Sequence, residues 1–162
     1  MKIIERNVSD LKPYRNNPRR NEAAVEPVSQ SIKAFGFKVP LVIDKDDVVV
    51  TGHTRLLAAK ELGLKKVPCI VADDLTEEQI NAFRLADNKV SEFSSWDWKS
   101  LRREIENLKA SPINLEYFGF DLGPLMEDNL SSYFEDAEGH NTPREKKAKT
   151  VRCPYCGEPV EL

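Results

Sequence analysis

One turn of this chain has the residue types and spacing of an anion-binding site. The β-branched run 48–50 passes through Gly52 into an apolar-periodic segment that opens with His53-Thr54-Arg55. A helix that starts there directs free backbone N–H groups and the positive end of its dipole toward the end of the strand, and the glycine lets a ligand approach without meeting a Cβ atom. Arg55 adds a planar guanidinium that holds phosphate through two hydrogen bonds. The same turn also occurs in α/β units that bind nothing, so other residues have to decide.

The two residues between Gly52 and Arg55 each have two interpretations. A protonated His53 would contact phosphate, and a neutral one would act as a general base. The structural alternative is a histidine at a helix start that hydrogen-bonds a neighbouring carbonyl. Thr54 is either a phosphate ligand or an ordinary residue of the first helical turn. The sequence leaves both alternatives open.

A second polar group follows later in the chain, at Asp87, Asn88 and Lys89. Carboxylate and amide oxygens on a short segment suit magnesium at Asp87 and Asn88, and Lys89 would add positive charge for a phosphate. The same residues also fit the end of a helix that begins at Thr76, because Asp and Asn are common at helix ends. Spacing alone favours the helix end.

The C-terminal segment contains the sequence Cys153-Pro154-Tyr155-Cys156-Gly157. Two thiolates at positions i and i+3 form half of a zinc knuckle, whereas structural zinc normally has four ligands. Cys69 is expected to be buried in a strand, and His140 lies in a segment without apolar pattern. We therefore expect any zinc to be shared with a second copy of the chain or with a partner. The alternative is a frayed terminus with two free thiols.

Short β-branched runs predict a small sheet. The predicted strands are residues 2–4, 41–43, 48–50 and 67–71. Helices are expected to end at Gly36 and Gly63, and to begin at Thr76 and at residues 94–97. Mixed helices and strands of this kind predict an α+β or α/β domain.

Two helices carry more detailed expectations. The helix that ends at Gly36 is expected to have this glycine as a left-handed C-terminal cap, and it contains Pro27, which fits only near its first turn. The helix that begins with the capping box at Thr76 is expected to bury Ile80, Phe83 and Ala86.

Several motifs occur in a fixed order along the first half of the chain. They are Ser31-Ile32-Lys33-Ala34-Phe35-Gly36, Pro40-Leu41-Val42-Ile43, Thr51-Gly52-His53-Thr54-Arg55, Val67-Pro68-Cys69-Ile70-Val71 and Leu85-Ala86-Asp87-Asn88-Lys89. Their order and spacing resemble the N-terminal domain of the ParB/sulfiredoxin superfamily, and most of all the ParB-like module found ahead of phage and bacterial DNA methyltransferases. The expected organisation is a ParB/sulfiredoxin-like domain at 1–95, a helical extension at 96–120, a flexible linker at 121–150 and the CxxC tail at 151–162.

The resemblance implies a nucleoside triphosphate, with CTP favoured, bound together with magnesium. It places Gly52, His53, Thr54, Arg55, Asn88 and Lys89 at the nucleotide, and Asp87 and Asn88 at the metal. In ParB the glycine is followed by a glutamate and two arginines, whereas this chain has His53 and Thr54 before its arginine. Fewer positive charges imply weaker triphosphate binding.

Three classes of function follow from this resemblance. The leading one is a nucleotide-binding module, non-catalytic or weakly catalytic, that serves DNA modification or segregation in a phage or mobile element. The second is a ParB-like nuclease or nucleotide hydrolase, with His53 as the catalytic residue. The third is a scaffold with a vestigial pocket. Sulfiredoxin chemistry is disfavoured because the glycine turn contains no cysteine.

Composition restricts the partners and the compartment. A net charge of −3 over 162 residues argues against a protein that coats DNA by bulk electrostatics, so DNA contact is expected to be weak and local, at Arg15, Arg19 and Arg20. There is no methyltransferase motif, and any methylation would come from a separate methyltransferase. No apolar run approaches a membrane span and there is no secretory leader, so the expected location is the cytoplasm of a bacterium or a phage-infected cell.

Overall fold

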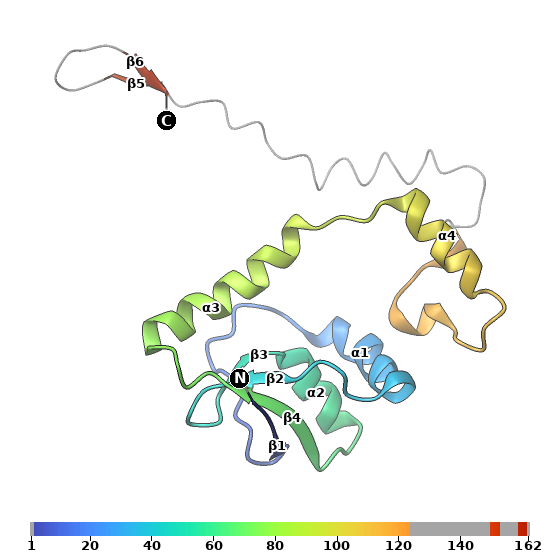
Figure 1. Ribbon diagram of the computed structural model, residues 1–162, viewed down its shortest axis with the longest axis horizontal. Coiled ribbons are helices and arrows are strands. Elements are labelled where there is room, and N and C mark those ends of the chain that lie inside the picture. The colour runs from blue at the N-terminus through green and yellow to red at the C-terminus, as the bar shows by residue number, and fades with distance from the viewer. Residues whose placement is uncertain (1, 124–149, 153–158, 162) are drawn as a thin grey trace. The chain divides into compact units, whose positions relative to one another are not determined.

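The computed structural model describes residues 2–123, 150–152 and 159–161 (Figure 1), which fall into two units, Met1–Leu122 and Gly123–Leu162. The strands are β1 (Ile3–Asn7), β2 (Leu41–Ile43), β3 (Val49–Thr51), β4 (Lys66–Val71), β5 (Thr150–Arg152) and β6 (Pro159–Glu161). The helices are α1 (Glu22–Phe35), α2 (His53–Glu61), α3 (Glu77–Val90) and α4 (Trp98–Leu108), with short 3₁₀ helices η1 (Ser91–Phe93) and η2 (Leu115–Phe118). The predicted mixed α+β class is confirmed.

The first unit is built on a four-stranded mixed sheet in the order β1-β4-β2-β3. β4 is antiparallel to β1 and parallel to β2, and β2 is antiparallel to β3. The two middle strands carry fully buried side chains, including Leu41, Ile43 and Cys69. The expectation that Cys69 is a buried thiol is confirmed, and burial raises its pKa.

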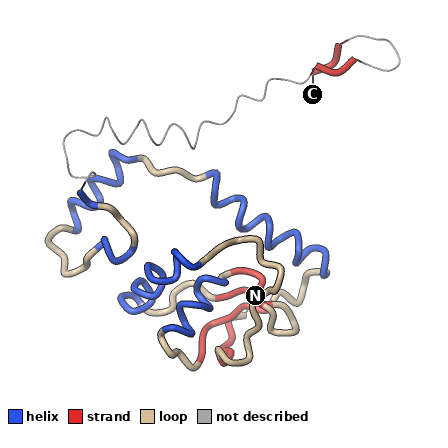
Figure 2. The backbone as a smooth tube through the Cα atoms, turned by 180° about the vertical axis from the view of Figure 1, so that it is seen from behind, coloured by secondary structure: helices blue, strands red, loops and turns tan. Residues whose placement is uncertain are grey.

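One helix completes the core of this unit, and a second helix packs against the first. Leu56, Ala58 and Ala59 are the buried residues of α2, which contacts β2. α1 packs beside α2, and Figure 2 shows the two helices next to the strands. The end of β3 and the start of α2 therefore lie next to α1.

Local signals in the sequence explain where two of the helices begin. The capping box at the start of α3 is present: the Thr76 side chain accepts a hydrogen bond from the Gln79 N–H, and the Gln79 side chain accepts one from the Thr76 N–H. The Asp97 carboxylate caps α4 by accepting the Ser100 N–H at 3.1 Å. Both helix starts were predictable because a cap needs only residues three positions apart.

Three of the detailed expectations were wrong. In α3 the buried residues are Ile80 and Arg84, whereas Phe83 and Ala86 are exposed. Pro27 lies inside α1 and not in its first turn, because the helix already begins at Glu22. Gly36 has the positive φ of 77° expected after α1, but its ψ of 174° is not that of a left-handed helical cap.

The helical extension packs back onto α1. η2 contacts α1, and the rings of Phe35 and Phe118 lie 5.3 Å apart, between centroids. The rings of Trp96 and Phe120 form a second pair at 5.9 Å. Residues 96–120 therefore belong to the same compact unit as the sheet.

The second unit contains the short antiparallel pair β5 and β6. Cys153 and Cys156, the predicted zinc ligands, fall between these strands and lie outside the described residues, as does most of the predicted linker. Among the described residues, no helix is long and apolar enough to cross a membrane.

Candidate functional site

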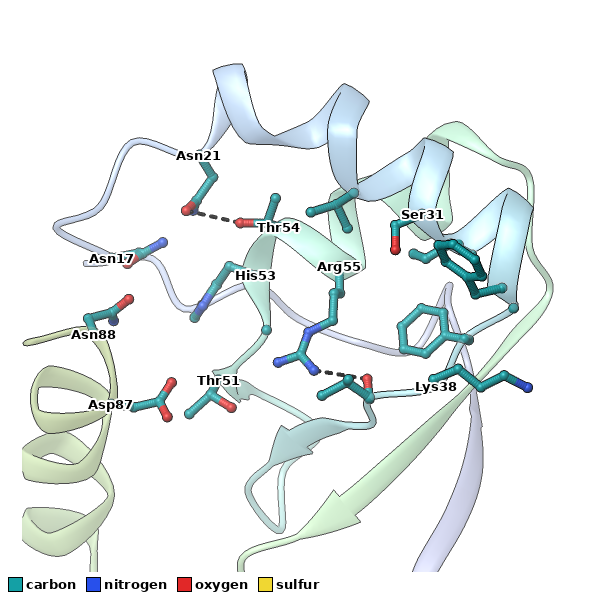
Figure 3. Close-up of a pocket in the computed structure, with 17 residues that line it drawn as sticks. Asn17, Asn21, Ser31, Lys38, Thr51, His53, Thr54, Arg55, Asp87 and Asn88 are labelled. Carbon is teal, nitrogen blue, oxygen red and sulfur yellow. Dashed lines mark hydrogen bonds between the residues drawn. The ribbon is translucent and has the colours of Figure 1, made fainter. Parts of the chain in front are cut away.

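A cavity of about 680 Å³ lies at the predicted turn, where α1, the start of α2 and the C-terminal part of α3 meet (Figure 3). We call it the Gly52 cavity. Its volume is within the range of small-molecule sites. Its lining is Asn17, Asn21, Val28, Ser31, Ile32, Phe35, Gly36, Phe37, Lys38, Val39, Thr51, Gly52, His53, Thr54, Arg55, Asp87 and Asn88.

The cavity has two chemically different ends. One end lies along α1 and the following segment and carries Ser31 and Lys38 (Figure 3); the apolar lining residues of these two segments are Val28, Ile32, Phe35, Phe37 and Val39. Asparagine, threonine and aspartate side chains gather at the other, around the start of α2 (Figure 3). Such a lining suits a ligand that has a flat apolar part and a polar or charged part.

Gly52 is required by the geometry of the turn. It has φ 96° and ψ 26°, a left-handed conformation that disfavours any other residue. An added Cβ atom would lie 2.6 Å from Cδ2 of the fully buried Leu41. No side chain caps α2, so its first backbone N–H groups are available to a ligand at this end of the cavity.

Arg55 has two roles in the cavity wall. Its Nη1 donates hydrogen bonds to the carbonyls of Val39 and Pro40, at 2.9 and 3.0 Å, and so ties α2 to the segment that leads into β2. Its Nε and Nη2 lie 3.2 and 3.0 Å from the point that a Cβ atom on Gly52 would occupy. That edge of the guanidinium therefore lies close against Gly52, and a side chain at position 52 would collide with it. Burial lowers the pKa of Arg55, and the charge of Asp87 opposes this shift.

His53 makes a hydrogen bond that the sequence did not predict. Its Nε2 accepts a hydrogen bond from the backbone N–H of Tyr14 at 3.2 Å, so the ring is neutral and carries its proton on Nδ1. Burial lowers the pKa of His53, and the positive charge of Arg84 lowers it further. Among the described residues, the ring accepts from an amide and donates to no carbonyl, and Nε2 cannot serve as a general base while this bond holds.

Thr54 and the pair Asp87-Asn88 also line the cavity. The Thr54 hydroxyl donates to Oδ1 of Asn21 at 3.2 Å, which connects α2 to the residue that precedes α1. In Asn88, Nδ2 donates to the Arg84 carbonyl at 2.8 Å, and Oδ1 already accepts from Arg19. Asp87 makes no hydrogen bond within the described part of the chain. The pair therefore offers one uncommitted carboxylate and one engaged amide.

The remaining predicted residues do not line the Gly52 cavity. Lys89 forms an ion pair with Glu92 on the same side of the helix end. Arg15 and Arg20 are exposed, and Arg19 contacts Asn88 from outside the cavity. Across the described residues, no group of three or more His, Cys, Asp or Glu side chains forms a metal site.

A family model decides the identity of this fold. The model of the ParB N-terminal domain matches residues 1–89, which include all the elements that build the cavity. The chain belongs to the ParB N-terminal domain family. The resemblance found in the sequence is thereby confirmed, whereas its methyltransferase-associated branch stays a prediction.

Relatives of this ParB-like domain differ greatly in length. The chain is 39% identical over 80 residues to the ParB-like nuclease domain-containing protein YnaK of Escherichia coli, covering 49% of this chain and 92% of that protein. It is 29% identical over 86 residues to a probable chromosome-partitioning protein ParB of Campylobacter jejuni, covering 50% of this chain but 31% of that protein. The truncated ParB of Caulobacter crescentus, solved with CTP-γ-S, has a similar fold: the TM-score is 0.66 at 20% identity, covering 85% of this chain and 87% of that one.

Several lining residues of the ParB-like domain were not recognised in the sequence. Asn21 was given no role, and Ile32 and Phe35 were attributed to the apolar spacing of a helix, whereas the resemblance already placed the loop segment around Asn17 near the site. Arg84, which does not line the Gly52 cavity, was also missed: it is 8% exposed and its guanidinium lies 3.9 Å from the centre of the Tyr14 ring. A usable signal was its spacing of four residues from both Ile80 and Asn88, which places all three on one face of α3.

Proposed function

We propose that the Gly52 cavity binds a nucleoside triphosphate, and that the domain serves DNA transactions as a nucleotide-responsive module. The observation that carries this proposal is the pairing, in one cavity, of an apolar end with a phosphate-type end at an uncapped helix start. CTP is the favoured nucleotide, because the Caulobacter relative with the similar fold was solved with CTP-γ-S.

The two ends of the cavity assign the parts of the nucleotide. The base and ribose pack at the apolar end, against the side chains of α1 and Phe37. The phosphates take the backbone N–H groups at the start of α2 and the Nε–Nη2 edge of Arg55. Arg55 also holds the Val39–Pro40 backbone, so it both binds the ligand and positions the wall.

We expect slow hydrolysis or none. His53 accepts a hydrogen bond from the Tyr14 N–H and is kept neutral. Its role is therefore to position the loop that contains Tyr14. Of the two residues predicted to hold magnesium, Asp87 has an uncommitted carboxylate, whereas Oδ1 of Asn88 already accepts from Arg19; a magnesium ion bound there would neutralise charge on the phosphates.

The DNA role rests on the relatives. The Campylobacter relative is named as a chromosome-partitioning protein, and Arg15 and Arg20 offer exposed positive charge for a local, salt-sensitive contact. The proposal also includes a phage or mobile element as the setting, a separate methyltransferase as the partner, and the cytoplasm as the location.

Titration calorimetry of the full chain with CTP, ATP, GTP and UTP in magnesium buffer tests the nucleotide site. We expect heat with CTP, and at least a tenfold weaker affinity for Arg55→Ala, because a charged hydrogen-bonded contact and its support of the wall are lost together. Lys60→Ala is the matched control, since Lys60 is an exposed cation on the same helix and does not line the cavity. No heat from any nucleotide, or equal heats for the two variants, would reject the site and favour the scaffold alternative.

A nuclease is the second candidate, because the Escherichia coli relative is named as a ParB-like nuclease domain-containing protein. Incubation of supercoiled plasmid with the purified chain tests it. Robust nicking that His53→Ala abolishes would promote this candidate over the binding module.

A further inference from the structure

Arg19 connects the loop before α1 to the C-terminal end of α3. Its Nη1 donates to three oxygens: the Asn88 carbonyl at 3.2 Å, Oδ1 of Asn88 at 3.3 Å and Oγ of Ser91 at 3.3 Å. The Ser91 hydroxyl in turn donates to the Asn88 carbonyl at 2.8 Å. One cationic nitrogen thus lies among three oxygen acceptors, two of which belong to a residue expected to hold magnesium.

The orientation of Asn88 is determined from the other side. Its Nδ2 donates to the Arg84 carbonyl at 2.8 Å, so Oδ1 is directed to Arg19 by a second hydrogen bond of the same amide. A magnesium ion bound to Oδ1 would lie about 2.1 Å from that oxygen, directly beside the guanidinium charge. Two cations at that separation repel each other, so a divalent ion and Arg19 compete for the same oxygen.

The same arginine also holds the wall of the Gly52 cavity. The backbone N–H of Arg19 donates to Oδ1 of Asn17 at 3.3 Å, and its carbonyl accepts from Nδ2 of Asn21 at 3.4 Å. Both asparagines line the cavity, although Arg19 does not. The contact with Asn88 therefore joins the loop wall of the cavity to its α3 wall, across 69 positions of sequence.

We propose that Arg19 takes the place of a divalent ion at Asn88, so that this domain binds its nucleotide without requiring magnesium. Arg19 is a positioning residue: it supplies the positive charge behind Asn88 and keeps the two walls together. A metal ion reaches Asn88 only after Arg19 has left. This inference rests on the proposed nucleotide site, and its test has a part that needs no nucleotide.

The first part of the test is CTP calorimetry of the full chain with magnesium and with EDTA. We expect the affinity of the wild type to differ by less than twofold between the two buffers. Arg19→Ala should bind at least tenfold more weakly in EDTA and recover in magnesium, because the Asn88 oxygens become available to the metal. Arg103→Ala, at an exposed arginine of α4 that does not line the cavity, should behave as the wild type. A thermal melt of each variant confirms that it is folded.

The second part is a manganese titration of the nucleotide-free proteins, with free Mn²⁺ measured by electron paramagnetic resonance. We expect Arg19→Ala to bind manganese that the wild type and Arg103→Ala do not. Equal manganese binding by all three proteins, including none by any, overturns the inference. So does wild-type CTP binding that falls tenfold in EDTA. An absence of CTP binding in every buffer rejects the proposed function, and the manganese comparison still decides the role of Arg19.

Discussion

The Gly52→Ala substitution tests the geometry of the turn most directly. The new Cβ atom would lie 2.6 Å from Cδ2 of Leu41, a separation that side chains do not adopt without movement. Leu41 is fully buried in β2, between β3 and β4, so its side chain moves only if the packed core around it moves as well. The residue must also keep φ near 96°.

The expected magnitude has two parts. A non-glycine residue in a left-handed conformation costs about 1–2 kcal/mol, and inserting a carbon into a packed core costs about 1–3 kcal/mol. Together they lower the free energy of unfolding by about 2–5 kcal/mol, which at about 4 °C per kcal/mol for a unit of this size is about 8–20 °C in Tm.

Gly63→Ala is the matched control. Gly63 also has a positive φ, of 65°, at the other end of α2, but nothing lies within 4 Å of an added Cβ atom. It should show the backbone part alone, about 1–2 kcal/mol. Urea denaturation followed by circular dichroism measures both variants. If Gly52→Ala destabilises the protein no more than Gly63→Ala does, then the packing of Gly52 on Leu41 has been misjudged.

Three further predictions concern His53, Arg84 and the tail. The pKa of His53 is lower in the folded chain than the ordinary histidine value of about 6.5. Below that pH the unfolded chain therefore binds more protons than the folded chain, so the free energy of unfolding should fall as the pH drops below about 6.5. His53→Gln keeps an acceptor for the Tyr14 N–H and should remove this pH dependence of the free energy of unfolding, measured by urea denaturation between about pH 7.5 and 5. If the pH dependence is unchanged in His53→Gln, another group causes it. Arg84→Ala leaves Asp44 and the Tyr14 ring without their cation and should lower the free energy of unfolding by about 2 kcal/mol or more, measured by urea denaturation. Arg103→Ala, at an exposed arginine, should leave the free energy of unfolding nearly unchanged. Equal losses of stability in the two variants would contradict a packing role for Arg84. Elemental analysis with light scattering should find one zinc per two chains, and Cys153→Ser should lose this zinc. A zinc-free monomer that Cys153→Ser does not change would show that the tail has no role in dimerisation.

Parts of the molecule that depend on neighbours in sequence were predictable. The strand, glycine and helix around Gly52 follow from a β-branched run that meets an apolar helical period, and the caps at Thr76 and Asp97 act over three residues. The motif order in residues 31–89 was sufficient to indicate the ParB N-terminal domain. These features are local, so the amino-acid types carry them without a tertiary structure.

Other features depend on what the folded chain places beside each residue. Phe83 is exposed and Arg84 buried, because Tyr14 and Asp44 from distant segments supply partners for the guanidinium, whereas a hydrophobic pattern assigns a charged residue to solvent. The proton position on His53 depends on the Tyr14 N–H, 39 residues away.

The sequence by itself determined the family, the mixed α+β class and the turn at which a phosphate is expected. Only the tertiary structure decided which polar atoms of that site are engaged: Arg55 Nη1 by two carbonyls, and Asn88 by Arg19. The physical reason is that secondary structure follows from the preferences of adjacent residues, whereas the availability of a donor or acceptor depends on every group that folding brings within hydrogen-bond distance.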